Sequence, residues 1–206
     1  MERPVTVIAN YVAVWANSPF AAEDLPWIAT QQAETLIRSA LSTLNSEYHI
    51  ADGIAVHRSA TIESGAVLKG PAIIGPDCFV AANAYLRGGV YLAGNCIVGP
   101  AAELKTSFMF PGSKIAHLNF VGDSILGSGV NVEAGAMIAN YRNELTDKRI
   151  RIRHEGRVID TGVDKFGALV GDESRIGANA VIAPGALLTP SSRIGRLQLV
   201  DQWNTP

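Results

Sequence analysis

Branched aliphatic residues recur at every sixth position through the middle of this chain. The first run has no gap and consists of Ile50, Val56, Ile62, Leu68, Ile74, Val80, Leu86, Leu92, Val98 and Leu104. The spacing returns twice, first as Leu126, Val132 and Ile138 and then as Val170, Ile176, Ile182, Leu188 and Ile194. A small residue follows most of these aliphatics by four positions, as at Ala60, Ala66, Ala72, Cys78, Ala84, Cys96 and Ala102. This period predicts short strands joined by tight corners and stacked as a β-solenoid.

Three six-residue units per coil would place residues eighteen positions apart one above the other. Cys78 and Cys96 would then stack in the core, where small buried thiols are favoured over a redox pair. Arg87 and Lys105 would share a column on the outside of the solenoid. The spacing alone leaves open whether these two cations form a solvated face or a local anion site.

The repeat is interrupted twice. Residues 106–125 are predicted to form a loop that presents His117, in the segment PGSKIAHLNFVGDS. Residues 142–164 are predicted to contain a β-hairpin, because KRIRIR and RVID alternate on either side of HEG. The basic RIRIR run is interpreted as an exposed strand face rather than as a site for an acidic group.

The residues before the repeat are predicted to form a helical appendage over 1–48. The segment EDLPWIATQQAETLIRSALSTLN has near-helical apolar spacing, with Asp24 as the expected cap and Pro26 in the first turn. Alternation over Val5, Val7 and Ala9 predicts a short strand ahead of it. The solenoid domain is then expected over 49–196 and a C-terminal tail over 197–206.

Composition narrows the function classes. The chain is 48% hydrophobic and 17% charged with a formal net charge of -2, which gives no electrostatic case for nucleic acid or an anionic membrane as the partner. There is no apolar run of the roughly 18 residues that a membrane span requires. Two cysteines without a convincing export signal favour a reducing compartment, so we expect a cytoplasmic protein.

Two segments carry a family resemblance. GSKIAHLNFVGDS followed by GVNVEAGAMIANY resembles the acetyltransferase domain of the bifunctional glucosamine-1-phosphate acetyltransferases and N-acetylglucosamine-1-phosphate uridylyltransferases. DTGVDKFGALVGD, after the hairpin, is similar to the archaeal-type sugar-1-phosphate nucleotidylyltransferase/acetyltransferases. The resemblance covers roughly residues 50–195. It implies an all-β fold, a left-handed parallel β-helix with an N-terminal helical appendage.

The resemblance also implies an activity and partners. The expected reaction transfers acetyl from acetyl-CoA to the amine of a glucosamine 1-phosphate-like sugar phosphate or of a nucleotide-linked amino sugar. A homotrimer with active sites between subunits is expected, and we predict that the apolar residues Phe108, Met109 and Phe110 need covering by a neighbour. The nucleotidylyltransferase domain is expected to be absent, because the residues before the solenoid contain no glycine-rich nucleotide loop, so a separate nucleotidylyltransferase is a candidate partner.

The family's functional residues map onto this sequence one by one. The resemblance implies a catalytic base at His117. It implies acceptor ligands at Arg87, Lys105, Phe120, Asn131, Asn140 and Lys165. It implies coenzyme contacts at Ala134 and Ala178. Phe120 stands where the family usually has a tyrosine, so one hydroxyl that could contact the acceptor is missing.

The chemistry fits a histidine base, because an amine must lose a proton as it attacks a thioester and histidine exchanges protons near neutral pH. The other histidines, His49, His57 and His154, are interpreted as surface residues. A zinc carbonic anhydrase is a weaker alternative because the spacings of His57, His117 and His154 do not match its ligand pattern, and no metal is expected. A non-catalytic trimeric scaffold is the stronger alternative, and Phe120 is its best support.

Overall fold

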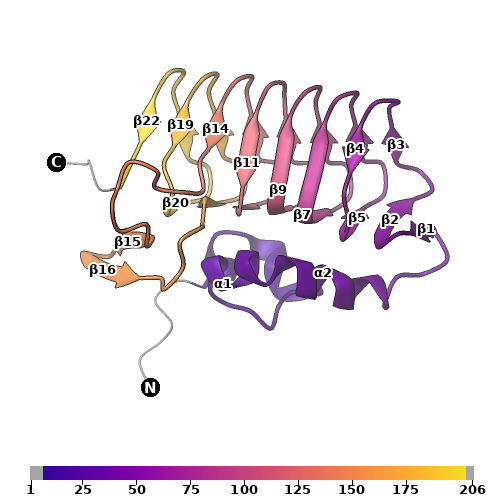
Figure 1. Ribbon diagram of the computed structural model, residues 1–206, viewed down its shortest axis with the longest axis horizontal. Coiled ribbons are helices and arrows are strands. Elements are labelled where there is room, and N and C mark those ends of the chain that lie inside the picture. The colour runs from indigo at the N-terminus through magenta and orange to yellow at the C-terminus, as the bar shows by residue number, and fades with distance from the viewer. Residues whose placement is uncertain (1–6, 203–206) are drawn as a thin grey trace.

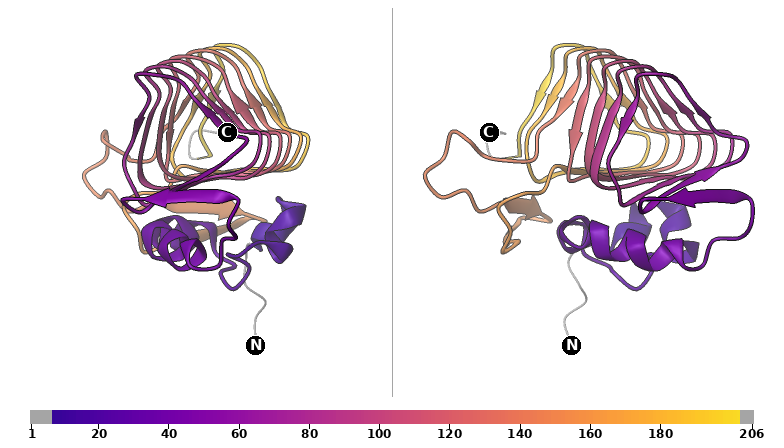
Figure 2. Two further views of the ribbon diagram at one scale, coloured as in Figure 1. Left: turned by 90° about the vertical axis from the view of Figure 1, so that its right-hand side faces the viewer. Right: turned by 45° about the vertical axis from the view of Figure 1, so that its right-hand side comes forward.

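The computed structural model describes residues 7–202, and most of them form a parallel β-solenoid whose coils stack along one axis (Figure 1). Seen along that axis, each coil is triangular, with three flat faces that meet at corners (Figure 2). Strands of successive coils pair in parallel on every face. The predicted parallel β-helix is therefore confirmed.

The three faces are called A, B and C. Face A contains β2 (Ile54–His57), β5 (Ala72–Ile74), the second halves of β7 (Tyr85–Leu92) and β9 (Glu103–Met109), β12 (Ile125–Leu126), β17 (Ala168–Val170) and β20 (Ala186–Leu188). Face B contains β4 (Val67–Leu68), the first halves of β7 and β9, β11 (Phe120–Gly122), β14 (Met137–Ile138), β19 (Val181–Ile182) and β22 (Leu199–Val200). Face C contains β3 (Thr61–Ile62), β6 (Phe79–Val80), β8 (Ile97–Val98), β10 (Lys114–Ile115), β13 (Asn131–Val132), β18 (Arg175–Ile176) and β21 (Arg193–Ile194).

The repeated aliphatics and small residues fill the interior of the prism. Val80, Leu86 and Leu92 have no exposed surface, and they belong to one continuous apolar core. Cys78 and Cys96 are buried free thiols one coil apart, as the eighteen-residue spacing predicts. The first aliphatic of the repeat is an exception: Ile50 is 48% exposed, because it lies on β1 (Tyr48–Ala51), which pairs antiparallel with β2 outside the core.

The predicted loop over 106–125 is wrong, because these residues continue the coils as β9 to β12. Leu86 pairs with Leu104, eighteen positions later, whereas Leu104 pairs with Val121, only seventeen positions later. The missing residue is at a corner, where Thr106 alone takes the place that Gly88 and Gly89 fill in the coil before. The six-residue spacing therefore slips by one while the stack itself continues.

The N-terminal segment contains the 3₁₀ helices η1 (Ile8–Asn10) and η2 (Ala13–Asn17) and the α-helices α1 (Pro26–Gln31) and α2 (Ala33–Leu41). The predicted short strand is wrong for its described part, because η1 follows directly after Val7, and Val5 lies outside the described residues. Pro26 begins α1 as predicted, but Asp24 is not its cap: Leu25 holds that position and gives no side-chain cap. Gln32 separates α1 from α2.

This segment packs along face A, beneath the prism in Figure 1, through a second apolar cluster. Phe108 and Phe110 point into that cluster, where the ring of Trp15 meets them at 5.9 and 5.7 Å between centroids. Met109 points the other way, into the solenoid core. All three are buried within one chain, so the prediction that they need covering by a neighbouring subunit is wrong.

An excursion leaves the stack after β14 and returns at β17. It carries β15 (Arg151–His154) and β16 (Arg157–Asp160), which pair antiparallel and confirm the predicted hairpin. Leu126 pairs with Val170 across the excursion, so the register resumes as if the insertion were absent. At the far end, β22 still pairs with β19, so the described part of the predicted tail completes a coil. No helix within 7–202 combines the length and the apolar character needed to cross a membrane.

Candidate functional site

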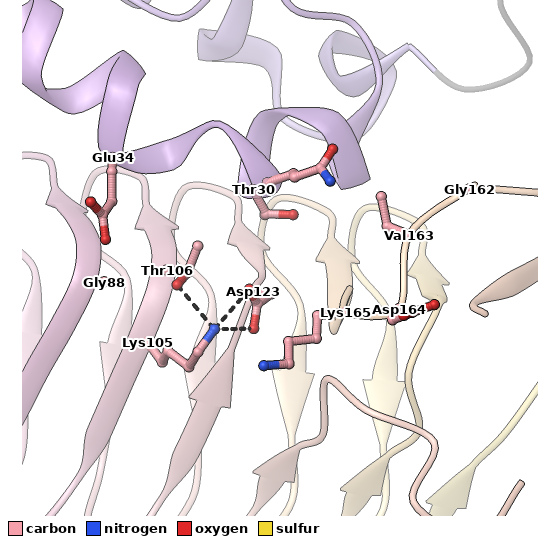
Figure 3. A pocket seen from close by; sticks show the side chains of 11 residues that line it. Thr30, Glu34, Gly88, Lys105, Thr106, Asp123, Gly162, Val163, Asp164 and Lys165 are labelled. Atoms are coloured by element: carbon pink, nitrogen blue, oxygen red, sulfur yellow. Dashed lines mark hydrogen bonds and ion pairs between the residues drawn. The ribbon is translucent and has the colours of Figure 1, made fainter. Parts of the chain in front are cut away.

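A cavity of about 610 Å³ lies where the solenoid, the N-terminal helices and the end of the hairpin excursion meet (Figure 3). The solenoid contributes Lys105 and Asp123 from the corner that joins faces B and A. The excursion contributes Lys165, whose ammonium points toward these two residues. The remaining lining residues are Thr30, Gln31, Glu34, Gly88, Thr106, Gly162, Val163 and Asp164. Two predicted acceptor ligands, sixty positions apart in the sequence, thus share one cavity.

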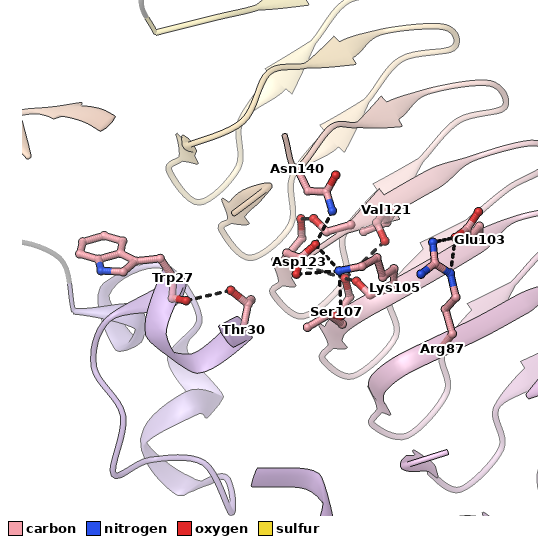
Figure 4. A network of polar contacts seen from close by, with 12 residues as sticks. Trp27, Thr30, Arg87, Glu103, Lys105, Ser107, Val121, Asp123 and Asn140 are labelled. Carbon is pink, nitrogen blue, oxygen red and sulfur yellow. Dashed lines mark hydrogen bonds and ion pairs between the residues drawn. The ribbon is translucent and has the colours of Figure 1, made fainter. Parts of the chain in front are cut away.

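Asp123 holds two of the predicted site residues together (Figure 4). Its carboxylate accepts hydrogen bonds from the Lys105 ammonium at 2.8 and 3.0 Å, and from the side-chain amide of Asn140. Lys105 also donates to the Thr106 hydroxyl at 3.1 Å. These hydrogen bonds hold the partly buried ion pair in one geometry. Asp123 therefore determines the position of the Lys105 ammonium.

Arg87 lies beside Lys105 in the same column, as the coil arithmetic predicts. Its guanidinium, however, is 2.6 Å from the carboxylate of Glu103 and is outside the residues that line the cavity. Each cation of the column therefore carries its own carboxylate partner, Glu103 for Arg87 and Asp123 for Lys105. Lys165 also lines the cavity, and its ammonium has no hydrogen-bond or ion-pair partner among residues 7–202.

His117 lies on a corner of the solenoid and not on a loop. The corner joins β10 to β11, and the imidazole is exposed there. Lys105 pairs with Gly122 at the opposite end of β11. Five residue steps separate His117 from Gly122. At 3.3 Å per extended residue, the Cα atoms of these two residues are at most about 16 Å apart. Phe120, the first residue of β11, lies between them in the sequence.

A buried amide shapes the corner that carries His117. Asn119 occupies the inward position that Ala102 and Ala136 hold at the neighbouring corners, and it is buried. Its side-chain amide donates to the backbone carbonyls of Glu133 at 2.8 Å and Ala136 at 3.1 Å. The His117 corner is thereby tied to the next coil. The sequence offered one signal for this role, a polar residue where the repeat expects a small apolar one.

Ala134 and Ala178, the predicted coenzyme contacts, lie in the same column as His117. The carbonyl of His117 accepts from the amide of Gly135 at 2.9 Å, that of Ala134 from Asn179 at 3.0 Å, and that of Ala178 from Leu197 at 3.0 Å. These three residues therefore hold equivalent positions on successive corners. The small side chains of Ala134 and Ala178 leave the column open beside the imidazole of His117.

Asn131 is on the other side of that corner, on face C, and is not in the lysine cavity. It lines a smaller cavity of about 210 Å³ together with Glu133, Arg175 and Arg196. The Arg196 guanidinium donates to both carboxylate oxygens of Glu133, each at 2.9 Å, and the amide of Ala178 donates to one of them. These contacts, that of Arg196 foremost, hold the pKa of Glu133 below its ordinary value.

Among the remaining histidines, His49 and His57 lie on the paired strands β1 and β2, and His154 lies on the hairpin. His57 is on β2 next to Tyr48, and His154 is on the hairpin beside Glu155. Within residues 7–202 there is no group of three or more His, Cys, Asp or Glu side chains placed to hold a metal ion.

Comparisons with known proteins find a matching repeat profile and several sequence relatives. A profile described as the hexapeptide repeat of succinyl-transferase matches residues 71–99. A bifunctional sugar-1-phosphate nucleotidylyltransferase/acetyltransferase of Sulfurisphaera tokodaii is 34% identical over 75% of this chain and 38% of its own length. A bifunctional protein GlmU of Methanococcus vannielii is 34% identical over 64% of this chain and 30% of its own length. The chain thus spans less than two fifths of the length of these two relatives.

A relative of comparable length is similar to nearly the whole chain. An uncharacterised acetyltransferase, YaiX, of Escherichia coli O6:K15:H31 is 26% identical over 91% of this chain and 82% of its own length. A solved UDP-N-acetylglucosamine acyltransferase from Arabidopsis is 16% identical with a TM-score of 0.35, over 70% of this chain and 52% of its own. With its six-residue repeat, its stacked parallel coils and the profile match, the chain is a hexapeptide-repeat solenoid that is similar in sequence to acetyltransferases and bifunctional nucleotidylyltransferase/acetyltransferases.

Proposed function

We propose that this protein is an N-acetyltransferase that transfers acetyl from acetyl-CoA to the amine of an amino-sugar phosphate, such as glucosamine 1-phosphate, or of a nucleotide-linked amino sugar. One observation carries the proposal: the exposed imidazole of His117 lies on the corner before β11, and the cavity with Lys105 and Lys165 lies where that strand ends. A base and an anion site along one side of the solenoid suit a substrate with an amine and a phosphate. The sugar-phosphate name of the Sulfurisphaera relative is consistent with this choice.

In the proposed reaction, His117 accepts a proton from the acceptor amine while the nitrogen attacks the thioester carbon. The new C–N bond replaces the C–S bond, and the imidazolium then returns the proton to the departing coenzyme A thiolate. Lys165 and Lys105 hold the phosphate through charge-assisted hydrogen bonds. Asn140 donates its side-chain N–H to Asp123, which leaves its amide oxygen free to accept from another donor of the acceptor sugar. The open column of Ala134 and Ala178 is the proposed coenzyme path.

We also propose a homotrimer with active sites between subunits. Face B supports it, because Phe120, Met137, Val181 and Leu199 are aligned by register and the last three are exposed. The corner beside His117 adds Leu118, which is 64% exposed. Contiguous apolar surface of this kind is normally covered. Light scattering at micromolar concentration tests the assembly, and a stable monomer would remove it.

The activity is tested by incubating the protein with acetyl-CoA and either glucosamine 1-phosphate or UDP-glucosamine, and by following free thiol and acetylated product. We expect product with at least one of these acceptors. Failure to acetylate either amine, together with no rise in melting temperature on addition of acetyl-CoA, would favour the scaffold alternative. A cytoplasmic location and a separate nucleotidylyltransferase partner belong to the same proposal, and the buried free thiols Cys78 and Cys96 are consistent with the former.

A further inference from the structure

The N-terminal helices form one wall of the lysine cavity. Thr30 and Gln31 come from the end of α1, and Glu34 comes from the first turn of α2. None of these residues belongs to the solenoid repeat. The cavity that holds Lys105 and Lys165 is therefore completed by a segment that lies outside the six-residue pattern.

This wall is seated on the solenoid by backbone contact. At Gly89, which has a φ of +91°, a Cβ atom would come within 2.9 Å of the backbone nitrogen of Glu34. The adjacent Gly88 has a φ of +70°, and a Cβ there would meet the Thr106 hydroxyl at 2.8 Å. Gly89 thus lets α2 approach the corner next to Lys105, and Gly88 leaves room for the Thr106 hydroxyl. On the other side, Trp27 of α1 packs edge-on against Phe166, with 6.1 Å between ring centroids. The wall is fixed to both of the elements that supply the lysines.

Glu34 carries the free carboxylate in this wall. Figure 3 shows it directed toward the solenoid corner at Gly88. It makes no hydrogen bond or ion pair with any residue in the range 7–202, whereas Asp123 is engaged by Lys105 and Asn140. An ionised carboxylate only accepts hydrogen bonds, and it repels a phosphate. With the ammonium of Lys165 available for the anion, the partner that suits Glu34 is a neutral hydroxyl group.

We propose that Glu34 is a specificity-determining residue that accepts a hydrogen bond from a sugar hydroxyl of the acceptor, so that the N-terminal helical segment is part of the acceptor site. The inference rests on the proposed function for the class of the ligand, a phosphorylated amino sugar. It adds that the segment before the solenoid selects among such acceptors, and that the phosphate lies toward Lys165 and away from α2.

The experiment measures binding by calorimetry and turnover in the same set of variants. Glucosamine 1-phosphate is titrated into the wild type, Glu34→Ala, Glu34→Gln and Glu34→Lys. Glu155→Gln is the matched control, since Glu155 lies at the hairpin tip with its side chain 84% exposed. We expect Kd to rise about tenfold or more in Glu34→Ala, as for the loss of a hydrogen bond to a charged group, and less in Glu34→Gln, whose amide oxygen still accepts. KM should follow Kd, and kcat should stay within about twofold.

Deoxy acceptors identify the hydroxyl. The 3-, 4- and 6-deoxy analogues of glucosamine 1-phosphate are compared in the wild type and Glu34→Ala. One deoxy analogue should bind the wild type as weakly as glucosamine 1-phosphate binds Glu34→Ala. For that analogue, Glu34→Ala should cause almost no further loss of affinity, because the missing hydroxyl and the substitution remove the same contact. Unequal, additive losses for every analogue would contradict a hydrogen bond to a hydroxyl.

The remaining outcomes separate this inference from the proposed function. If Glu34→Ala binds glucosamine 1-phosphate as the wild type does while Lys105→Ala binds it more weakly, the role of Glu34 is overturned and the function stands. Tighter binding by Glu34→Lys would mean that the phosphate lies against α2, which also overturns the inference. If neither glucosamine 1-phosphate nor UDP-glucosamine binds the wild type, both the inference and the proposed function are overturned. Unchanged melting temperatures verify that each variant is folded.

Discussion

The ammonium of Lys105 and the carboxylate of Asp123 form a two-pronged ion pair, with nitrogen to oxygen distances of 2.8 and 3.0 Å. Only 17% of the Lys105 side chain and 7% of the Asp123 side chain are exposed. In such a partly buried pair, removing one partner leaves the other charge without compensation. Lys105 therefore has two roles that a single substitution would change together, one in the fold and one in the proposed binding of phosphate.

Lys105→Ala should raise the acceptor KM by about 10- to 100-fold, as for the loss of one charge-assisted contact, and leave the KM for acetyl-CoA nearly unchanged. Lys114→Ala removes an exposed cation from face C and is the matched control. Steady-state kinetics with each substrate varied in turn check the prediction. Weakened coenzyme binding with the acceptor spared would show that the lysine cavity belongs to the other substrate.

The structural role of the same pair is tested at Asp123. This residue has a φ of +45°, which asparagine tolerates better than alanine does. Asp123→Ala should lower the free energy of unfolding by about 3 kcal/mol, since it strands the ammonium of Lys105 and strains the corner. Asp123→Asn should cost less, and Lys105→Ala combined with Asp123→Asn should recover part of the stability lost in Lys105→Ala alone. Denaturant unfolding measures all four variants, and strict additivity would contradict a coupled pair.

His117→Ala should fold and assemble normally and bind both substrates, yet lose roughly 10² to 10⁴ in kcat. Its side chain is exposed on a corner, so truncation leaves no cavity in the core. A base also predicts that the decline of kcat at acidic pH disappears in the residual activity of the variant. Two pH profiles with a verified acceptor decide the matter. Equal activity in the variant would return His117 to the surface residues and revive the scaffold alternative.

Glu133→Gln should reduce stability at neutral pH but not in acid. The contacts from Arg196 and Ala178 lower the pKa of Glu133 in the folded protein, so their stabilisation is present above the carboxyl pKa of the unfolded chain, roughly 4.3. It is lost as the pH falls through the lower folded value. The difference in melting temperature between wild type and variant should therefore shrink below about pH 4. A difference that stays constant through the acid range would rule out this linkage.

The stack of coils was predictable because one period governs it. Leu86 and Leu104 stack through an eighteen-residue step, and the same step correctly placed Arg87 beside Lys105. The period misled at Ile50, which lies outside the core, and where a corner lost one residue at Thr106, since counting in sixes then reads regular strands as a loop.

The contacts that build the cavity were not predictable in the same way. Asp123 lies eighteen positions after Lys105, the step of one regular coil, but it falls within residues 106–125, which the sequence pattern predicted to be a loop, so this contact was not expected. The position of Glu34 could not be predicted from the repeat, because it depends on how α2 packs against the corner at Gly88 and Gly89. Periodicity determines neighbours within the solenoid, whereas the position of an appended helix depends on shape complementarity between side chains.

The contact that anchors the N-terminal segment to the solenoid affects the order of folding during synthesis. The amide of Ala13 donates to the carboxylate of Asp172 at 3.0 Å, and the carbonyl of Tyr11 accepts from the amide of Asp172. A ribosome makes the apolar residues around Trp15 and Phe20 long before it reaches this aspartate. Until then, the nascent segment lacks its final anchoring point, while coils already complete behind it can begin to stack. The contacts of Tyr11 and Ala13, near the start of the described chain, can therefore form only after Asp172 has been made.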